Sequence, residues 1–391
     1  MPIAQPSSSY QICTRCVMDT TDPAISFNAQ GVCSHCQRYD QVIAKAWHPN
    51  EHGAALFSAQ LDRMRAERRS REYDCVLGLS GGIDSSFLAL KMKEMDVRPL
   101  IVHVDAGWNS ELAVHNIERV VKYCGYDLTT VVIDWEEMRD LQAAYLRSGV
   151  ANQDVPQDHA FFASLYRYAI KHGIRHVISG SNYATESILP QSWGHSAMDG
   201  RNLKAIHRRH GTKPLRTFPV LNFFERNIFY PYVKKMVVLR PLNFMPYDKH
   251  AALQYLQATI GYKEYAYKHG ESVFTRFFQN YYLPTKFGYD KRRAHLSSEI
   301  LAGLKSRDDA LQILQEPLYQ ADDLQRDKIY IAKKLQIPQD EFEQLLQPPG
   351  HDYSEYANQD QMFRFMRAAK RALLGRRKSA GNSSQTSTDQ A

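Results

Sequence analysis

An α/β fold built on a doubly wound parallel sheet is the fold class that this sequence predicts. Four short apolar runs recur along the chain, at residues 75–79, 99–104, 128–133 and 176–178. Helical patterns near 110–124 and 158–172 separate them at the spacing of βα units. Runs this apolar are typical of parallel strands that helices cover on both faces. A turn rich in glycine and serine follows the first run, as expected where a strand leads into a ligand-binding loop.

This turn reads Ser80-Gly81-Gly82-Ile83-Asp84-Ser85-Ser86 and opens an amphipathic helix. The glycines let the backbone approach an anion, and the N–H groups at the helix start and the serine hydroxyls can donate to it. Asp84 would repel a phosphate unless a divalent cation lay between them, so the sequence also predicts Mg²⁺. No lysine follows the glycines, which excludes the GxxxxGK[ST] loop. The alternative is a serine-rich turn without a chemical role.

Ligands of such a sheet bind beyond the carboxyl ends of the strands, where the strand order reverses. The 80–86 turn should therefore meet the segments 103–107 and 179–182. The turn resembles the SGGxDS signature of the PP-loop ATP pyrophosphatases, which split ATP into AMP and pyrophosphate while they adenylate a substrate. The resemblance implies that the turn cradles the β- and γ-phosphates and that the segment after the second strand receives adenine and ribose. The implied ATP-binding residues are Ser80, Gly81, Gly82, Asp84, Ser85, Ser86, His103, Val104, Asp105, Ser179 and Gly180.

Two CxxC pairs near the start of the chain, Cys13 with Cys16 and Cys33 with Cys36, have the spacing of a structural zinc site. Four thiolates complete a tetrahedron and leave no position for water, so this zinc would be structural rather than catalytic. His35 lies inside the second pair and could replace one of the cysteines.

Two disulfides are the competing interpretation of the same four cysteines. The sequence shows no signal peptide, and we expect the protein in the cytoplasm, where thiols stay reduced. The remaining cysteines, Cys75 and Cys124, fall on a strand and at a helix end and look like ordinary buried residues. Zinc is therefore favoured over disulfides.

The net charge of +7 is confined to one part of the chain. Residues 361–378 hold seven basic side chains and no acidic one, whereas residues 1–360 sum to +1. A near-neutral body argues against a nucleic-acid partner. The basic segment should form an amphipathic helix that packs on the domain or contacts an anionic membrane or an acidic protein. No apolar stretch approaches the ~20 residues of a membrane span.

The 391 residues suggest one main α/β domain with appendages. We divide the chain into a zinc-binding module (10–45), a helical linker (46–72), an ATP-binding α/β domain (73–215), a mainly helical region for substrate and partners (216–350), the basic helix (351–378) and a disordered tail (379–391). The first nine residues are also expected to be disordered.

Three separated motifs extend the likeness to a family. They are the first CxxC pair with Val17-Met18-Asp19, the stretch from Ser179 to Ser187, and residues 286–297, which include Lys-Phe-Gly-Tyr-Asp-Lys-Arg-Arg. Together they resemble the N-acetyl sugar amidotransferase family of bacterial surface-polysaccharide and lipopolysaccharide O-antigen biosynthesis. The likeness covers the chain from about Cys13 to about residue 345 and is not expected to continue into the basic tail.

This resemblance implies an activity. The family converts an acetamido group of a nucleotide-linked sugar into an acetamidino group, through an adenylated imidate that ammonia displaces. By this resemblance Asp84, Ser80 and Lys286 are catalytic, and Asn182, Glu186, Lys291, Arg292 and Arg293 bind the substrate. The chain shows no glutaminase motif, so ammonia would come from separate partners similar to the glutaminase and cyclase subunits of imidazole-glycerol-phosphate synthase. No histidine is singled out as a general base.

Two other functions stay open on the sequence. A PP-loop enzyme that modifies tRNA, of the thiolase or lysidine type, would share the adenylation chemistry, although a thiolase needs a reactive cysteine near the loop. A non-catalytic adaptor would combine a zinc ribbon with a degenerate nucleotide fold. The intact 80–86 turn argues against the adaptor.

Overall fold

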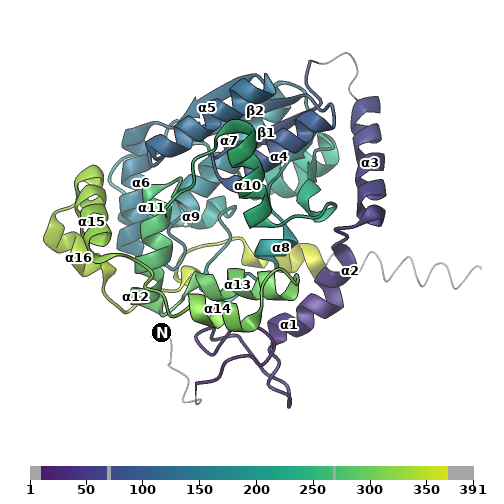
Figure 1. Ribbon diagram of the computed structural model, residues 1–391. Coiled ribbons are helices and arrows are strands. Elements are labelled where there is room, and N and C mark those ends of the chain that lie inside the picture. Colours follow the sequence, from purple (N-terminus) through teal and green to yellow (C-terminus); the bar gives the residue numbers. More distant parts are fainter. Residues whose placement is uncertain (1–9, 68–71, 267–269, 369–391) are drawn as a thin grey trace, which may run out of the picture.

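A five-stranded parallel sheet forms the centre of the computed structural model, which describes residues 10–67, 72–266 and 270–368 (Figure 1). The strand order is β3-β2-β1-β4-β5, and all neighbours are parallel. The strands are β1 (Cys75–Gly78), β2 (Pro99–Asp105), β3 (Leu128–Val132), β4 (His176–Ile178) and β5 (Val237–Leu239). The predicted α/β class and the four predicted strands are confirmed.

The chain builds β2 and β3 on one side of β1 and then crosses to build β4 and β5 on the other. The strand order therefore reverses between β1 and β4. At such a point the loops that leave the two strands diverge and open a crevice.

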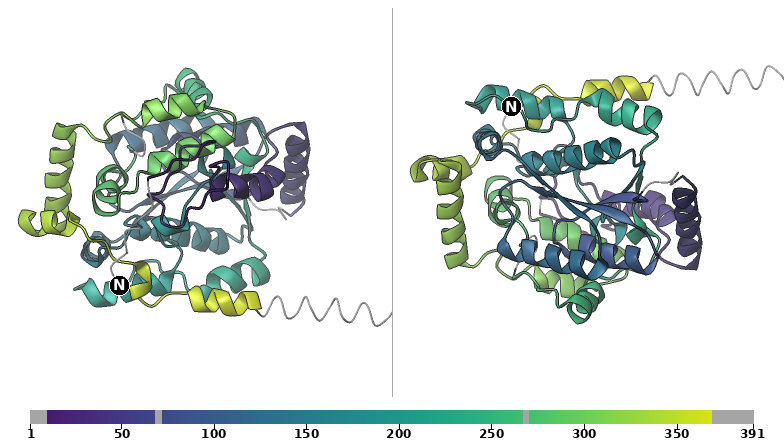
Figure 2. Two further views of the ribbon diagram at one scale, coloured as in Figure 1. Left: turned by 90° about the horizontal axis from the view of Figure 1, so that it is seen from below. Right: turned by 90° about the horizontal axis from the view of Figure 1, so that it is seen from above.

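Helices cover both faces of the sheet (Figure 2, right). Alternate residues of a strand point to opposite faces. Accordingly, Leu77 of β1 packs in a cluster with α4 (Ile83–Glu94), α5 (Glu111–Cys124) and α10 (Lys249–Ile260). Its neighbour Val76 packs in a second cluster with α6 (Trp135–Ser148) and α7 (Val155–Lys171).

The helix ends follow local sequence signals. Ser110 accepts a hydrogen bond from the N–H of Ala113 at the start of α5, and Gly125 ends the helix at φ +69°. A serine N-cap and a left-handed glycine satisfy backbone groups that a helix leaves unpaired at its two ends. The predicted helix over 110–124 is therefore confirmed.

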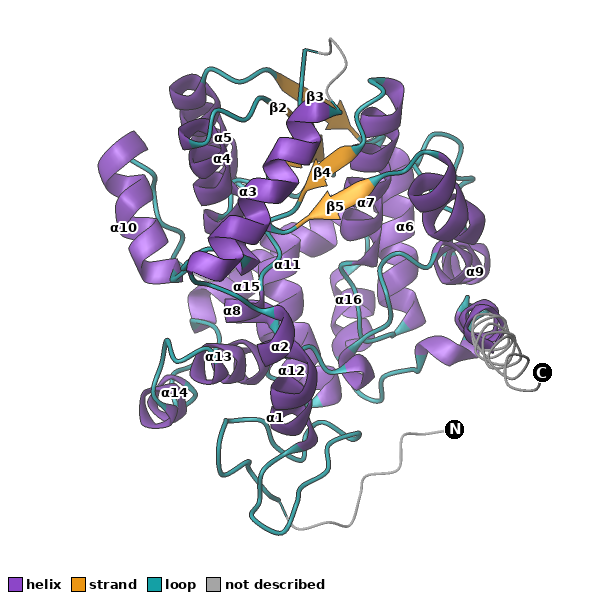
Figure 3. Cartoon of the chain, turned by 90° about the vertical axis from the view of Figure 1, so that its right-hand side faces the viewer, coloured by secondary structure: helices purple, strands orange, loops and turns teal. Residues whose placement is uncertain are grey.

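The remaining helices extend the domain beyond this core, with α3 on one side and α15 and α16 on the other (Figures 1 and 3). They are α1 (Ser34–Arg38), α2 (Ala44–Ala46), α3 (Glu51–Ala66), α8 (Tyr183–Glu186), α9 (Gly200–His210), α11 (Val273–Phe277), α12 (Leu283–Phe287), α13 (Lys291–Leu301), α14 (Arg307–Ile313), α15 (Ala321–Leu335) and α16 (Gln339–Leu346). Short π-helical turns over 39–43, 225–233 and 278–282 and 3₁₀ turns over 191–193, 241–243 and 353–355 join some of them.

The strand β5 lies in the segment 216–350, which the sequence analysis assigned to a mainly helical region. It pairs with β4, so the sheet continues past the predicted domain boundary at residue 215. The strand has only three residues, and its exposed Val237 and Val238 give no alternation of buried and exposed positions. The equally short β4 was predicted because a helical pattern over 158–172 precedes it at the spacing of a βα unit. Before β5 the chain forms a π-helical turn over 225–233 that contains Pro231, which gives no such pattern, so β5 was missed.

The N-terminal module packs against α13 and α14. Arg293 of α13 pairs with the fully buried Asp19 at 3.0 Å and donates to the carbonyl of Val17. Arg307 of α14 donates to the carbonyl of Cys13 at 2.9 Å. The module and the region after residue 270 therefore form one packed unit.

Residues 360–368 are helical, as predicted for the start of the basic segment. The ring of Phe363 lies 5.0 Å from that of Phe223, whereas Phe365 is 77% exposed. This part of the helix thus touches the domain through one aromatic side chain and leaves another in solvent. Residues 369–378, the predicted tail 379–391 and the first nine residues lie outside the described part of the chain. Among the described helices, none is long and apolar enough to cross a membrane.

The carboxylate of Glu137 in α6 holds the loop that contains residues 216–218. Its carboxylate is 8% exposed and accepts the backbone N–H groups of Arg216, Thr217 and Phe218 at 2.7–3.0 Å. Burial raises the pKa of Glu137, but these amide hydrogen bonds outweigh it and hold the pKa below its usual value. The stabilisation is therefore complete at neutral pH and is lost as the pH falls through the lowered pKa.

We predict that Glu137→Ala lowers the free energy of unfolding by about 3 kcal/mol, because three amides lose a charged acceptor. Denaturant unfolding at pH 7 measures the change. The neighbouring Glu136 is 53% exposed in its side chain, so Glu136→Ala serves as the control and should leave stability little changed. Equal effects of the two substitutions would contradict the assigned role of Glu137.

Candidate functional site

A cavity of about 480 Å³ opens at the carboxyl ends of β1, β2 and β4, within the size range of small-molecule sites. The three segments expected to converge do meet there. Ser80, Gly82, Asp84 and Ser85 line it from the first segment, His103 and Val104 from the second, and Ser179 and Gly180 from the third. Helices α7, α8 and α13 close the other side.

The turn after β1 has the backbone shape that its glycines allow. Gly82 is the N-cap of α4, and Gly81 has φ +83°. A Cβ on Gly81 would lie 2.8 Å from the carbonyl oxygen of Ala113, so only glycine fits. Tyr262 and Tyr265 donate their hydroxyls to the carbonyl of Gly81, at 2.8 and 2.9 Å. The turn is thereby held with the start of α4 facing the cavity.

Not every residue of the turn faces the cavity. Ser86 is fully buried beneath it, and Gly81 is buried in the turn itself, so neither lines the cavity. The hydroxyls of Ser80 and Ser85 lie 3.3 Å apart, and the N–H of Gly82 donates to Ser80 Oγ at 3.3 Å. The two serines therefore form the polar surface that the turn presents.

Asp84 is held from two sides. Tyr247 donates its hydroxyl to Oδ1 of Asp84, and the amide of Asn182 lies 3.4 Å from the same oxygen. Burial and the nearby Asp84 carboxylate raise the pKa of Tyr247 well above its usual value. Asn182 is also the N-cap of α8, where its side chain accepts from Thr185 N. These contacts fix the carboxylate while Asp84 still lines the cavity.

His103 and Asp105 mainly shape the end of β2. His103 Nδ1 lies 2.9 Å from the carbonyl of Leu79 and Nε2 lies 3.0 Å from the amide of Asn109, which assigns the Nδ1-protonated, neutral ring. Asp105 accepts the N–H of Gly107 at 2.8 Å. It thus makes a turn, the common role of an acidic residue at a strand end, and it does not line the cavity.

One face of α7 lines the cavity along its whole length. Its first turns contribute Asp154, Gln157 and Asp158, and its later turns contribute Phe161 and Leu165. Residues three and four apart share a helix face. The cavity therefore has a polar end beside the start of α7 and an apolar end beside the later turns, where Val177 and Val238 also line it.

The polar end concentrates charge. Lys291 at the start of α13 lines it together with Glu186 from the end of α8. Burial raises the pKa of Asp154 to about 6. Asp158 is exposed to the cavity, yet the protein atoms around it and the Asp154 carboxylate raise its pKa to about 7; Lys291 opposes both rises. Sequence reasoning missed both aspartates. The spacing of Asp154, Asp158 and Phe161 places them on one face of a helix, and the sequence shows this spacing. Only the fold shows that this face meets the turn after β1.

Three predicted site residues lie elsewhere. Lys286, expected to be catalytic, donates to the carbonyls of Leu345 and Gln347, the first at 2.9 Å, and it is absent from the cavity wall. Arg292 pairs with Asp290 at 2.8 Å, and Arg293 pairs with Asp19. Lys286 and Arg292 thus donate to backbone carbonyls at helix ends, and Arg293 pairs with a buried carboxylate. Of the basic run, only Lys291 reaches the cavity because successive residues of a helix point in different directions.

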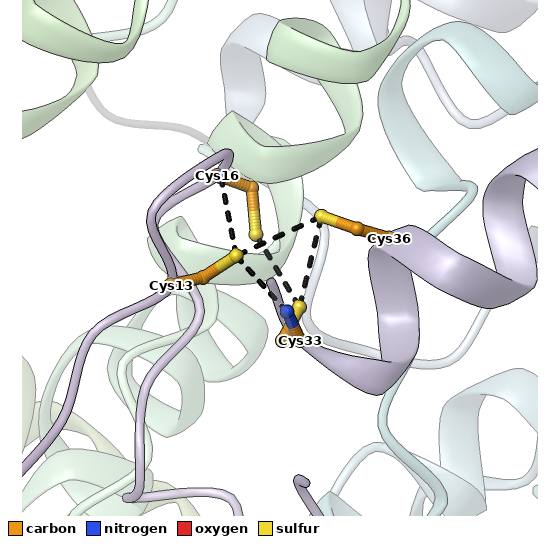
Figure 4. A group of neighbouring side chains, drawn as sticks. All are labelled: Cys13, Cys16, Cys33 and Cys36. Carbon is orange, nitrogen blue, oxygen red and sulfur yellow. Dashed lines mark hydrogen bonds between the residues drawn. The ribbon is translucent and has the colours of Figure 1, made fainter. Parts of the chain in front are cut away.

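The four predicted cysteines form a compact cluster (Figure 4). Their sulfur atoms lie within 4.8 Å of one another, with Cys13–Cys36, Cys16–Cys33 and Cys33–Cys36 separations of 3.7–3.8 Å. A tetrahedron with Zn–S bonds of about 2.3 Å has edges of about 3.8 Å. The sulfurs are too far apart for disulfides, and the cluster is positioned to bind a metal ion, consistent with structural zinc.

Backbone amides support a negative charge on this cluster. The N–H groups of Arg15, Cys16 and Cys33 donate to Cys13 Sγ at 3.3–3.4 Å. Such outer contacts orient metal ligands. His35 instead pairs with Asp22 at 2.6 Å and is not a ligand candidate.

The fold and the cavity define an α/β protein whose glycine- and serine-rich turn lines a cavity at the point where the strand order reverses. Residues 271–370 match the family model of the C-terminal domain of WbpG-like LPS biosynthesis proteins. No curated protein matches the chain. The match continues past residue 345, where the likeness was expected to end. It supplies five residues of the cavity wall, namely Glu271, Ser272, Thr275, Gln279 and Lys291.

We predict that the purified protein contains one zinc ion per chain and that Cys16→Ser loses most of it, because three thiolates hold zinc less well than four. Elemental analysis by mass spectrometry measures the content. Since the module packs on α13, the same variant should also melt at a lower temperature. Cys75→Ser, which alters a buried cysteine of β1, is the control and should keep its zinc. Full zinc content in Cys16→Ser would contradict the site.

Proposed function

We propose that this protein is an ATP-dependent amidotransferase of LPS or related surface-polysaccharide biosynthesis. It would convert an acetamido group of a nucleotide-linked sugar into an acetamidino group through an adenylated imidate. The observation that carries the proposal is one continuous cavity that joins the 80–86 turn to a polar chamber built partly from the WbpG-like region.

The turn after β1 supports ATP as the co-substrate. Ser80, Gly82 and Ser85 would bind the β- and γ-phosphates with hydroxyls and with the amides at the start of α4, where the helix dipole favours an anion. The apolar end, with Phe161, Leu165 and Val177, suits a purine ring. Catalysis would consist largely of stabilising the departing pyrophosphate.

Asp84 supports Mg²⁺ at the same place. A fixed carboxylate beside a phosphate loop is repulsive alone, whereas Mg²⁺ prefers carboxylate and phosphate oxygens. Asp84 would hold Mg²⁺ against the β- and γ-phosphates, and the ion would supply neutralisation of the charge that develops there. Tyr247 and Asn182 would keep the carboxylate oriented.

The polar chamber supports a sugar substrate. Gln157, Thr275 and Gln279 offer amide and hydroxyl groups for sugar hydroxyls, and Lys291 offers a cation for a diphosphate or carboxylate. Thr275, Gln279 and Lys291 belong to the region that matches LPS biosynthesis proteins. Substrate recognition would therefore reside in that region, with Glu186 beside it. Asn182, predicted to bind substrate, is buried, does not line the cavity and contacts Asp84 instead.

An amide oxygen is a weak nucleophile, and an amide carbon is a weak electrophile. Attack of the oxygen on the α-phosphorus would release pyrophosphate and leave AMP on the oxygen. The carbon that bears this oxygen then accepts ammonia, and AMP leaves with the oxygen as the C–O bond breaks. This order of chemical steps explains why one cavity would bring ATP and an acetamido sugar together.

A separate protein would supply the ammonia. Four of the six cysteines form the metal-type cluster, and burial raises the pKa of the other two thiols, that of Cys124 to about 11. Neither is a nucleophile for glutamine hydrolysis or for the thiolase alternative. Glutaminase and cyclase-like subunits would fill this role.

The proposal is tested by pyrophosphate release with ATP, ammonium chloride and UDP-N-acetylglucosamine or other UDP- and CMP-linked acetamido sugars. Mass spectrometry should show a product lighter by about one unit, as oxygen becomes NH. Bulk tRNA in place of the sugar tests the RNA-modifying alternative, and the absence of pyrophosphate release with either acceptor would indicate an adaptor. Release driven only by tRNA would overturn the proposal.

We predict that Asp84→Asn lowers turnover at least about 100-fold, because the amide cannot hold Mg²⁺ against the phosphates. The same assay measures it, and zinc content and melting temperature should stay unchanged. Asp96→Asn, a matched change beyond the other end of α4, is the control. Normal turnover in Asp84→Asn would show that the bridging role is wrong.

A further inference from the structure

Asp158 is unusual among the acidic residues of the cavity. It lies in the first turns of α7, lines the cavity and is exposed. Among the described residues, none forms a hydrogen bond with its carboxylate. Asp154, one turn earlier, is instead 7% exposed and accepts from Thr275 Oγ1 at 3.0 Å and Gln157 Nε2 at 3.2 Å. Asp154 is thus a positioning residue, and Asp158 is available for a reaction.

The charges that face Asp158 come from three elements. Asp154 precedes it at the start of α7, Glu186 faces it from α8, and Lys291 faces it from α13. Although Asp158 is exposed to the cavity, the protein atoms around it raise its pKa to about 7. The nearby Asp154 and Glu186 carboxylates add to the rise, and Lys291 opposes it. A group that titrates near neutral pH can both take up and release a proton under working conditions.

Asp158 is not the only acid of the cavity wall. Glu271 lies near Gly82 of the turn, since a Cβ on that glycine would be 3.7 Å from Glu271 Oε1. Asp158 lies in the polar chamber with Lys291 and Glu186, one helical turn before Phe161. In the proposed complex this chamber would hold the sugar.

We propose that Asp158 is the general base that accepts a proton from the attacking ammonia nitrogen. The inference rests on the proposed amidotransferase function and deepens it. It assigns a catalytic role to a residue that neither the sequence motifs nor the family match single out.

The step balances as follows. The nitrogen lone pair of NH₃ forms a bond to the carbon of the cationic O-adenylyl imidate and gives a tetrahedral ammonium adduct. One N–H proton passes to the Asp158 carboxylate, which leaves a neutral amine on that carbon. The C–O bond then breaks, AMP departs with its electron pair, and the carbon remains as an amidinium. Asp158 afterwards releases its proton to solvent.

The test separates the two half-reactions. Exchange of labelled pyrophosphate into ATP, with acetamido sugar but without ammonia, reports adenylation. AMP formation with ammonium chloride reports the second step. We expect Asp158→Asn to keep exchange within about two-fold of the wild type and to lose about 100-fold or more in ammonia-dependent AMP formation.

The pH profile and a second nucleophile distinguish a base from a structural residue. In the wild type the second step should rise through pH about 7 as Asp158 ionises, and Asp158→Asn should lack this limb. Hydroxylamine is much less basic than ammonia, so its adduct loses a proton more readily without a base. The difference in rate between Asp158→Asn and the wild type should therefore be smaller with hydroxylamine than with ammonia. Asp158→Glu should recover part of the rate. The control is Asp340→Asn, an exposed aspartate in the first turn of α16.

Each outcome decides the matter. Normal ammonia-dependent turnover in Asp158→Asn would show that Asp158 is not the general base. An equal loss of exchange and of turnover would also contradict that role, because it would assign Asp158 to substrate binding. If the wild type shows no pyrophosphate exchange with any acetamido sugar, the proposed function itself is wrong. The role of Asp158 as general base would then be wrong as well.

Discussion

The reversal of strand order between β1 and β4 is the constraint on which the site depends. It makes the loops that leave these strands diverge, so that the 80–86 turn and the 179–182 segment face each other across a gap. The two remain in contact at the base, where a Cβ on Gly180 would meet Ser85 N at 3.4 Å. Asn182 reaches back from the second loop to Asp84 on the first. A parallel sheet thereby holds a carboxylate and a helix start in one fixed relation.

The cysteine cluster and the cavity are connected through α13. Asp19, three residues after Cys16, pairs with Arg293, and Val17 N donates to Ser297 Oγ at 3.1 Å. Lys291 at the start of the same helix lines the cavity. A metal ion that orders the cysteine loops would therefore also stabilise the placement of a cavity cation. A structural site distant in the sequence would in this way support the proposed chemistry.

The cavity separates its charges along α7. One end carries hydroxyls, helix-start amides and Asp84, whereas the polar chamber sets two aspartates and Glu186 against Lys291. The surrounding protein atoms and the neighbouring carboxylates raise the pKa values of Asp154 and Asp158 toward neutral pH. The arrangement suits a reaction in which one end stabilises a leaving anion and the other handles protons.

Local patterns in the sequence were enough for the sheet, the glycine turn and the four-cysteine cluster. Each of these rests on short-range chemistry: apolar runs at regular spacing, a glycine at positive φ, and thiols three residues apart. The strand β5 was missed because no helical pattern precedes it, whereas the equally short β4 follows one. Lys286, Arg292 and Arg293 were misplaced because a basic run looks alike whether it faces a ligand or a helix end.

What the sequence by itself determined is therefore the class of fold and the residue types of two sites. Only the tertiary structure decided which side chains share a cavity, since Asp154, Asp158 and Lys291 come from helices more than a hundred residues apart. Their proximity follows from packing α7 and α13 at the same end of the sheet. No local signal encodes that packing, because contact between distant helix faces depends on the whole core.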